Sequence, residues 1–311
     1  MIKLAVVGLG DIAHKGYLPL LSGWEGTQLM FCTRSQSRLD QAMQRFRVQQ
    51  GTTDLDELIA WQPQAALVLT ATVSHFEITH KLLQAGIDVL VEKPATMHAS
   101  QTRTLAETAD AYGRILMVGF NRRYAPLAQR ARSVWGERPV DMAIFERHRA
   151  TLLHPDTRAH MVEDCIHLVD MLRYLCGEAR AVHTSSYEAD GKFVHGTSVL
   201  EMDNHATILL QSSQRAGQWL ERYTLHGASA TLTLEAFSEL KLLEKGCEQI
   251  WREPYSSSWE TNLKGRGFQG EIQHFLEHIQ SREQPLTSAW DSVKTQELVE
   301  ALLRVQEQTG G

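Results

Sequence analysis

Cysteine is scarce in this sequence, and long apolar runs are absent. The four cysteines among 311 residues are scattered and lack the C-x-x-C spacing of metal or redox sites. No apolar run approaches the ~18 residues that a membrane-spanning helix needs. The first strand-like run begins at once, so we expect no signal peptide. These absences predict a reduced, cytoplasmic protein with no membrane segment and no metal.

Positive charge is not in excess either. The chain carries 31 Lys and Arg against 37 Asp and Glu, a formal net charge of −6. Without a basic stretch, nucleic acid is not an expected partner. The length is sufficient for two domains, each with its own apolar core.

The most informative segment is the first strand–helix turn. The apolar run 2–7 leads into Gly8-Leu9-Gly10-Asp11-Ile12-Ala13, which has the form G-x-G-x-x-A. In such a turn the first glycine permits a tight bend, the second lets the backbone approach a pyrophosphate, and the alanine lets helix and sheet pack closely. The free N–H groups at the helix start would bind the phosphates. The turn predicts a dinucleotide site, and the plainer alternative is a glycine-rich turn without a ligand.

The end of the second strand bears on which nicotinamide cofactor is bound. An NAD site usually has Asp or Glu there, to bind the ribose 2′-hydroxyl. This chain has Thr33, Arg34, Ser35 and Arg38 instead. The two arginines could pair with a 2′-phosphate, and the hydroxyls could donate to it. The plainer alternative is that a serine here caps the next helix, and such a cap is compatible with phosphate binding. We therefore expect NADP, with NAD possible.

Alternating strand and helix patterns continue to residue 122. Short, fully apolar strands with helices between them predict a doubly wound parallel sheet covered on both faces. The expected strands are 2–7, 28–32, 65–69, 88–91 and 115–119, and the expected helices are 12–21, 37–46, 54–61, 75–85 and 100–112.

The later pattern has strands without crossover helices, which indicates antiparallel pairing. We predict a Rossmann domain over residues 1–122 and an α+β domain over residues 123–311, with a large, mostly antiparallel open sheet. The expected strands are 140–147, 182–187, 197–202, 206–212, 221–226 and 231–234, and the helices are 124–135, 164–175, 268–281 and 290–308.

Glu92-Lys93-Pro94 follows the fourth strand, at the edge of the sheet where ligands bind in open α/β folds. A lysine there can donate to a substrate hydroxyl, stabilise a developing alkoxide, or relay a proton. Pro94 would restrict the backbone beside it. The alternative is a surface lysine paired with Glu92. We interpret Lys93 as a catalytic or substrate-binding residue.

Glu163 and His167 are four residues apart, so on a helix they would share one face. A histidine held by a carboxylate can act as a general base towards a hydroxyl. A helix-capping or buried structural histidine is the alternative. Asp156 and His160 have the same spacing and could imitate a metal pair, but no third ligand suggests itself.

Five motifs in this order resemble the Gfo/Idh/MocA oxidoreductases and, among them, the MviM-type members. They are the 8–13 turn, Thr70-Ala71-Thr72-Val73-Ser74-His75, Glu92-Lys93-Pro94, Gly119-Phe120-Asn121-Arg122-Arg123-Tyr124, and the 163–170 segment. The resemblance covers nearly the whole chain. It implies a Rossmann domain, an α+β domain whose open sheet forms dimers or tetramers of the chain, and hydride transfer between a nicotinamide and a sugar-like or cyclitol alcohol.

The resemblance also implies residue roles. Catalysis would fall to Lys93 and His167, with Glu163 orienting the histidine. Substrate contacts would come from Arg122, Arg123, Tyr124 and Asp164. The cofactor would be bound by Gly8, Gly10, Asp11, Ile12, Ala13, Thr33, Arg34, Ser35, Arg38, Thr70, Ala71, Thr72, His75, Glu92, Lys93 and Asn121.

The chain departs from the family pattern at several of these positions. Glu163 replaces an aspartate and Cys165 a glycine, while Ala71 and Thr72 replace part of a Thr-Pro-Asn run. A side chain at position 165 could crowd the cofactor or substrate. These departures leave two alternatives open: a cofactor-binding sensor or interaction protein without turnover, and a non-oxidative enzyme that uses its nicotinamide transiently.

Overall fold

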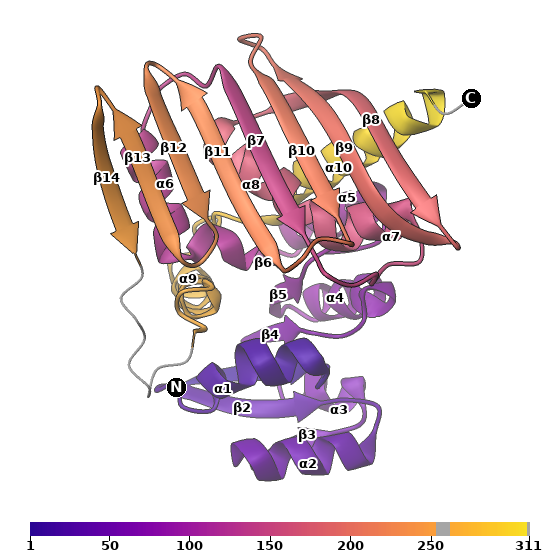
Figure 1. Cartoon of the computed structure of the whole chain (residues 1–311). Coiled ribbons are helices and arrows are strands. Elements are labelled where there is room, and N and C mark those ends of the chain that lie inside the picture. The colour runs from indigo at the N-terminus through magenta and orange to yellow at the C-terminus, as the bar shows by residue number, and fades with distance from the viewer. Residues whose placement is uncertain (253–261, 310–311) are drawn as a thin grey trace. The chain divides into compact units, whose positions relative to one another are not determined.

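The computed structural model describes residues 1–252 and 262–309, which form two compact units (Figure 1). Unit 1 comprises Met1–Phe120 and Phe268–Val293, and unit 2 comprises Asn121–Gly267 and Lys294–Gly311. The division differs from the single boundary expected near residue 122. The chain returns to unit 1 after the second sheet, so the 268–281 helix belongs with the N-terminal fold.

Unit 1 is built on a parallel sheet, as expected, with six strands where the sequence predicted five. The sheet order places β1 and β4 at the centre, where the direction of strand addition reverses. In sheet order the strands are β3 (Gln50–Thr52), β2 (Thr27–Cys32), β1 (Ile2–Val7), β4 (Ala65–Val68), β5 (Asp88–Glu92) and β6 (Leu116–Gly119).

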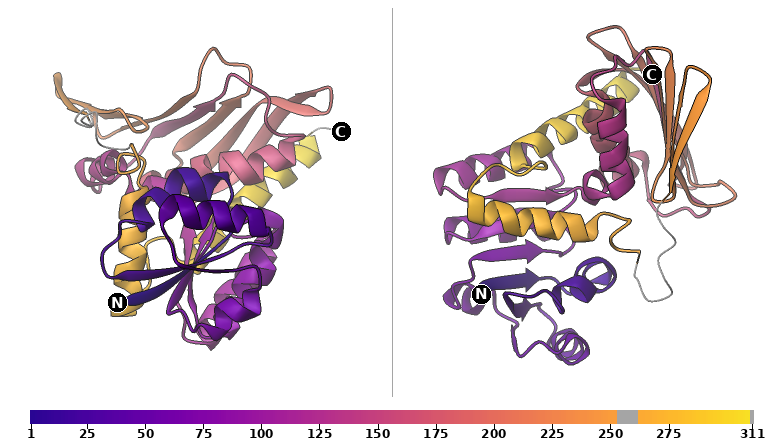
Figure 2. Two further views of the ribbon diagram at one scale, coloured as in Figure 1. Left: turned by 90° about the horizontal axis from the view of Figure 1, so that it is seen from below. Right: turned by 90° about the vertical axis from the view of Figure 1, so that its left-hand side faces the viewer.

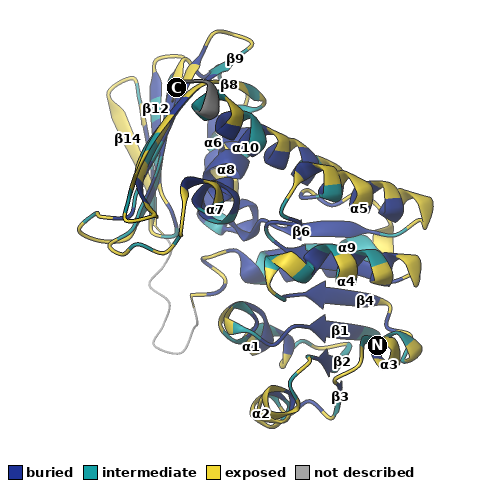
Figure 3. Ribbon diagram, turned by 90° about the vertical axis from the view of Figure 1, so that its right-hand side faces the viewer, coloured by how far each residue is buried: buried dark blue, intermediate teal, exposed yellow. Residues whose placement is uncertain are grey.

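Helices cover both faces of this sheet. They are η1 (Ala13–Tyr17), α1 (Leu18–Leu21), α2 (Gln36–Phe46), α3 (Leu55–Ala60), η2 (Thr72–Ser74), α4 (His75–Gln84), α5 (Ala99–Ala111) and α9 (Phe268–Ser281). Helices α4 and α5 pack together on one face, and α9 lies on the other, where the Phe268 ring meets Tyr17 of η1 (Figure 2). This two-sided cover explains why β4, β5 and β6 are buried along their whole length (Figure 3).

Local signals set the helix ends in unit 1. The Asp54 carboxylate caps α3 by accepting from the backbone of Asp56 at 2.7 Å, and Ser35 caps α2. Gly86 and Gly113 follow α4 and α5 with φ of +78° and +60°, which a glycine adopts without strain.

Unit 2 is built on an eight-stranded sheet. Only β7 and β10 pair in parallel, while the other six pairings are antiparallel. In sheet order the strands are β14 (Cys247–Arg252), β13 (Glu239–Glu244), β12 (Ala230–Glu235), β11 (Leu220–Gly227), β7 (Met142–His148), β10 (Thr207–Ser213), β9 (Lys192–Met202) and β8 (Ala179–Ala189).

One face of this sheet packs against helices and the other is open (Figure 1). The residues of β7, β10, β11 and β12 alternate between buried and more exposed positions, as a sheet with one covered face requires. The helical segments of unit 2 are η3 (Asn121–Tyr124), α6 (Pro126–Trp135), α7 (Thr157–His160), η4 (Met161–Cys165) and α8 (Ile166–Cys176), with α10 (Ala289–Thr309) entering it from unit 1.

The fold class is confirmed, but details differ from the sequence expectation. Strands β3, β13 and β14 were not expected. Ala13–Tyr17, expected as regular helix, is π-helical, and so is Met161–Cys165, which extends in front of the helix expected from residue 164. Such wide turns are often found at functional sites. Across the described residues the cysteines are free thiols, and no helix there is long and apolar enough to cross a membrane.

Candidate active site

The first strand–helix turn has the geometry that its glycines predict. Gly8 has φ +97°, and a Cβ there would come within 2.7 Å of the backbone of Leu69 and Thr70. A Cβ at Gly10 would meet nothing within 4 Å, so this backbone borders open space. Ala13 is fully buried at the start of η1. The turn therefore leaves room for a ligand to approach the backbone beside Asp11 and Ile12.

The end of β2 carries the residues predicted to distinguish NADP from NAD. Ser35 caps α2, with its hydroxyl accepting from the backbone of Arg38 at 3.4 Å. Arg34 and Arg38 are exposed, and Thr33 is half-buried. The capping role is thus present, and both guanidinium groups are accessible at this edge of the sheet.

The end of β4 is tied to the end of β5 through His75. Its ring is 1% exposed, and its two nitrogens lie 2.9 Å from the carbonyl oxygens of Thr70 and Pro94. The Ser74 hydroxyl donates to the Thr70 hydroxyl at 2.9 Å and to the Ala71 carbonyl at 2.8 Å. These contacts hold the turn that contains Thr72 without the proline that the family pattern usually has there.

The end of β5 places Lys93 at the same edge of the sheet. Lys93 is half-buried, and the peptide bond that joins it to Pro94 is cis. Its backbone N–H donates to Oε2 of Glu92 at 2.9 Å. Oε1 of Glu92 accepts from the Tyr17 hydroxyl at 2.8 Å. Unit 1 thus brings Lys93 and the predicted cofactor residues, except Asn121 of unit 2, to the carboxyl ends of its parallel strands.

In unit 2, the 121–124 segment is buried and engaged within the protein. The Asn121 amide donates to the Arg266 carbonyl at 2.8 Å. Arg123 forms a two-point ion pair with Asp170, at 2.9 and 2.6 Å. Tyr124 is 3% exposed. Contacts of these residues with a cofactor or substrate remain predictions.

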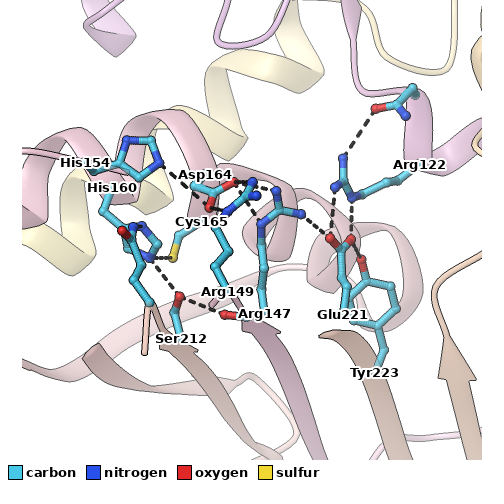
Figure 4. A network of polar contacts seen from close by, with 12 residues as sticks. Arg122, Arg147, Arg149, His154, His160, Asp164, Cys165, Ser212, Glu221 and Tyr223 are labelled. Carbon is cyan, nitrogen blue, oxygen red and sulfur yellow. Dashed lines mark hydrogen bonds and ion pairs between the residues drawn. The ribbon is translucent and has the colours of Figure 1, made fainter. Parts of the chain in front are cut away.

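Arg122 belongs to a buried ion-pair network that sequence reasoning did not find (Figure 4). It donates to both oxygens of Glu221, which also accepts from Arg147 and Tyr223. Burial alone raises the pKa of the Glu221 carboxyl, but Arg122 and Arg147 outweigh it and lower the pKa to about 2.

Asp164 forms the other end of this network. Its carboxylate accepts from Nε of Arg147 at 2.9 Å and from Nε of Arg149 at 2.6 Å. Burial raises its pKa, but hydrogen bonds from Arg149 and Arg147, with the His154 ring 3.8 Å away, hold the pKa well below its usual range. Asp164, predicted as a substrate contact, is therefore committed to ion pairs within unit 2.

The π-helical turn of η4 affects the predicted Glu163–His167 pair. Glu163 lies in η4, and His167 lies in the first turn of α8, where it is 5% exposed. A four-residue spacing corresponds to one turn of an α-helix but not of the wider π-helix. The pairing inferred from regular helix geometry therefore stays a prediction.

Cys165 points into the interior of unit 2. Its sulfur lies 3.1 Å from Nε2 of His160, and it lines a cavity of about 20 Å³ with Phe193 and Ser212. Burial lowers the pKa of His160 to about 3, so its ring is neutral.

His154, His160 and Asp164 place possible metal-ligand atoms within 4.8 Å of one another in the described part of the chain. The sequence paired His160 with Asp156, which instead caps α7. Arg147 and Arg149 occupy the Asp164 oxygens, and the two ring nitrogens of His160 contact Ser212 and Gln214. Two adjacent guanidinium groups disfavour a cation here.

Comparisons with known proteins agree with this arrangement. The profile of an oxidoreductase family with an NAD-binding Rossmann fold, Gfo/Idh/MocA, matches residues 2–120. The profile of that family's C-terminal alpha/beta domain matches residues 156–310. YceM of Salmonella typhimurium is 29% identical over 97% of both chains.

Two further proteins are similar over most of the chain. The myo-inositol dehydrogenase Hyg17 of Streptomyces leeuwenhoekii is 32% identical over 70% of both chains. The dehydrogenase MviM of Clostridium difficile has the same fold, with a TM-score of 0.89 at 23% identity over 97% of this chain and 99% of that one. The two family profiles, which match residues 2–120 and 156–310, show that this chain belongs to the Gfo/Idh/MocA family of oxidoreductases.

Proposed function

We propose that this oxidoreductase prefers NADP and transfers a hydride between the nicotinamide and a carbon of a sugar-like or cyclitol molecule. The observation that carries the proposal is the position of Lys93, half-buried at the carboxyl end of β5. It shares that edge of the sheet with the Gly8 turn, whose backbone borders open space at Gly10. When bound, the nicotinamide supplies the hydride acceptor or donor.

The protein side of the reaction is the handling of a proton. As an alcohol carbon loses its hydride, the hydroxyl must lose its proton, and the Lys93 side chain stabilises the developing alkoxide. His167 accepts the hydroxyl proton as the general base, and Glu163 stabilises the charged ring that results. In the direction of reduction, the same groups return a proton to the carbonyl oxygen.

Two features support the choice of NADP. No carboxylate stands at the end of β2, where it would repel a 2′-phosphate. Arg34 and Arg38 are both exposed there and can reach a phosphate while Ser35 caps the helix.

The substrate class follows from the family and from the name of the relative Hyg17, a myo-inositol dehydrogenase. Because Arg122, Arg123 and Asp164 are held in ion pairs, we propose that they form a rigid wall for a polyol rather than mobile ligands. The sensor alternative loses one of its supports, because the Cys165 sulfur contacts His160 inside unit 2.

The test is an initial-rate assay with myo-inositol, scyllo-inositol, aldoses and alditols, each with NADP⁺ and NAD⁺. We expect turnover with at least one polyol. At low cofactor concentration, the rate with NADP⁺ should exceed the rate with NAD⁺. Tight cofactor binding without turnover on any member of the panel would favour the sensor.

A further inference from the structure

Three buried side chains of unit 1 form a hydrogen-bonded chain that ends beside Lys93. Tyr17 closes η1, Glu92 closes β5, and Glu271 lies in the first turn of α9, 254 residues from Tyr17 along the sequence. Tyr17 and Glu271 are fully buried, and Glu92 is 7% exposed. The Tyr17 hydroxyl oxygen lies 2.8 Å from Oε1 of Glu92 and 2.8 Å from Oε2 of Glu271.

The surroundings fix the phenol in this position. The edge of its ring meets Phe268 of α9 at 5.3 Å between centroids, with the rings inclined by 78°. On β6, a Cβ at Gly119 would stand 3.2 Å from the Tyr17 hydroxyl and 3.3 Å from Cα of Glu92. A glycine there leaves the space in which phenol and carboxyl meet.

The hydrogen atoms available do not allow both carboxyls to be ionised. The Tyr17 hydroxyl has one hydrogen, which can lie in only one of its two contacts with carboxyl oxygens. If both carboxyls were ionised, the two oxygens of the other contact would have no hydrogen between them. In a buried site this repulsion is poorly screened. One carboxyl must therefore carry a proton and donate it to the phenol oxygen. Burial, Glu271 and Glu92 raise the pKa of Tyr17, so the phenol keeps its own hydrogen.

The contacts indicate which carboxyl is ionised. Glu92 also accepts the backbone N–H of Lys93 at 2.9 Å, and such a bond favours the charged form. Glu271 is fully buried, and desolvation favours its neutral form. The hydrogen bonds then run in one direction, from Glu271 to Tyr17 and from Tyr17 to Glu92.

We propose that Glu271 is protonated at neutral pH, and that Glu271 and Tyr17 are positioning residues for Lys93. Tyr17 and the backbone of Lys93 hold the two oxygens of Glu92, which fixes the carboxylate at the strand end. The arrangement leaves one negative charge beside the lysine instead of two. The role towards Lys93 rests on the proposed function, whereas the protonation of Glu271 does not.

The first test is infrared spectroscopy of the full chain at neutral pH. We expect a carboxylic acid carbonyl band that disappears in Glu271→Gln, whose amide can still donate to Tyr17. The band should persist in the control Glu277→Gln, an exposed carboxyl on the same helix. The absence of the band from the unmodified protein, or its persistence in Glu271→Gln, would overturn the assignment.

The second test is kinetic, with myo-inositol as probe substrate. Tyr17→Phe should lower kcat about tenfold through misplacement of Lys93, with the KM for NADP⁺ changed less than about twofold. Glu271→Gln should keep kcat within about threefold of the unmodified protein. If Tyr17→Phe leaves kcat unchanged, or changes only the KM for NADP⁺, then the hydrogen-bonded chain of Glu271, Tyr17 and Glu92 has a structural role only.

The two tests separate the inference from the proposed function. If the acid band is present and lost in Glu271→Gln, but no polyol is turned over, the proton assignment stands and the proposed function fails. If turnover is found and Tyr17→Phe leaves it unchanged, the proposed function stands and the positioning role fails. Circular dichroism shows whether each variant is folded.

Discussion

Lys93 is the side chain on which the proposed chemistry depends most. Its position at the end of β5 comes from backbone contacts, with Glu92 accepting from its N–H and His75 lying against the Pro94 carbonyl. We therefore expect that the Lys93 ammonium group can be removed without a change in the backbone that positions it.

We expect Lys93→Met to lower turnover at least a hundredfold, because it removes the proton-handling group and keeps the apolar stem. The melting temperature should stay close to that of the unmodified protein. Lys81→Met, at a lysine on α4 that pairs with Asp56, is the matched control. Turnover within about tenfold of the unmodified rate, a barrier change of about 1.4 kcal/mol, would remove Lys93 from the chemistry.

Arg34 should decide between the two cofactors. A charge-assisted hydrogen bond to the 2′-phosphate is worth ~1.5–3 kcal/mol, roughly ten- to a hundredfold in affinity. We predict that NADPH binds more tightly than NADH, and that Arg34→Ala removes most of the difference. Fluorescence titration measures both affinities, with Arg45→Ala, an exposed arginine on the helix α2 that follows Arg34, as control. Equal affinities in the unmodified protein would refute the NADP preference.

The helical segment that spans η4 and α8 is the element that links the family motif to the ion-pair network. Its π-helical turn carries Glu163 and Asp164, and the regular helix that follows carries His167. The two halves of the motif therefore have different helical geometry.

The proposed role of Glu163 predicts a kinetic signature. If its carboxylate stabilises the charged His167 ring, Glu163→Gln should lower the pKa that governs turnover and slow the reaction about tenfold near neutral pH. Glu163→Asp restores the family residue and should retain activity. A pH–rate profile of both variants measures this. Unchanged profiles with a lowered melting temperature would make the pair architectural.

The ion-pair network predicts acid sensitivity. Because Arg122 and Arg147 hold the pKa of buried Glu221 at about 2, below its ordinary 4.5, its stabilising effect is present above pH 4.5. That effect is lost as the pH falls from 4.5 towards 2, and amounts to about 3 kcal/mol of unfolding free energy. Chemical denaturation across this range should show a flatter pH dependence in Glu221→Gln than in the exposed control Glu277→Gln. Equal slopes would contradict the account.

The sequence predicted those parts of the fold that local patterns encode. The α9 helix was expected at 268–281 and lies at Phe268–Ser281, and a serine cap at the start of α2 was considered. The exposed edge strand β14 has no alternation of buried and exposed residues, so periodicity could not reveal it. Strand β13 does alternate, and its pattern could have been recognised.

The site was predictable only where a motif lies within one short segment. The Gly8 turn and the Lys93 segment could be identified because strand and turn are adjacent in the chain. Glu271 approaches Tyr17 because the chain returns to unit 1, and no local signal gives that return. The pairing of Arg147 with Glu221 likewise depends on the register of β7 and β11, which sets these two residues opposite each other.

Within the described part of unit 2, helices cover one face of the eight-stranded sheet and leave the other uncovered. Met142 and Leu243 lie in one cross-strand row of that face, and Ile250 lies on the same face of β14. Their exposed fractions of 39%, 45% and 39% are high for apolar side chains. We propose that a second copy of the chain covers this face.

The oligomer is testable by sedimentation. We expect a dimer or tetramer in solution, and Leu243→Glu should shift it towards monomer because a carboxylate would be buried unpaired. The control Glu77→Gln, at an exposed site of unit 1, should leave the oligomeric state unchanged. A monomeric unmodified protein would rule out this proposal.

Hydride transfer itself is the central claim, and isotope transfer tests it most directly. The protein would be incubated with NADP⁺ and myo- or scyllo-inositol deuterated at the ring carbons, and the cofactor analysed by NMR. The account predicts deuterium at C4 of the nicotinamide, on one face of the ring, and its loss in Lys93→Met. Cofactor that binds but gains no deuterium from any cyclitol, aldose or alditol of a deuterated panel would contradict the account.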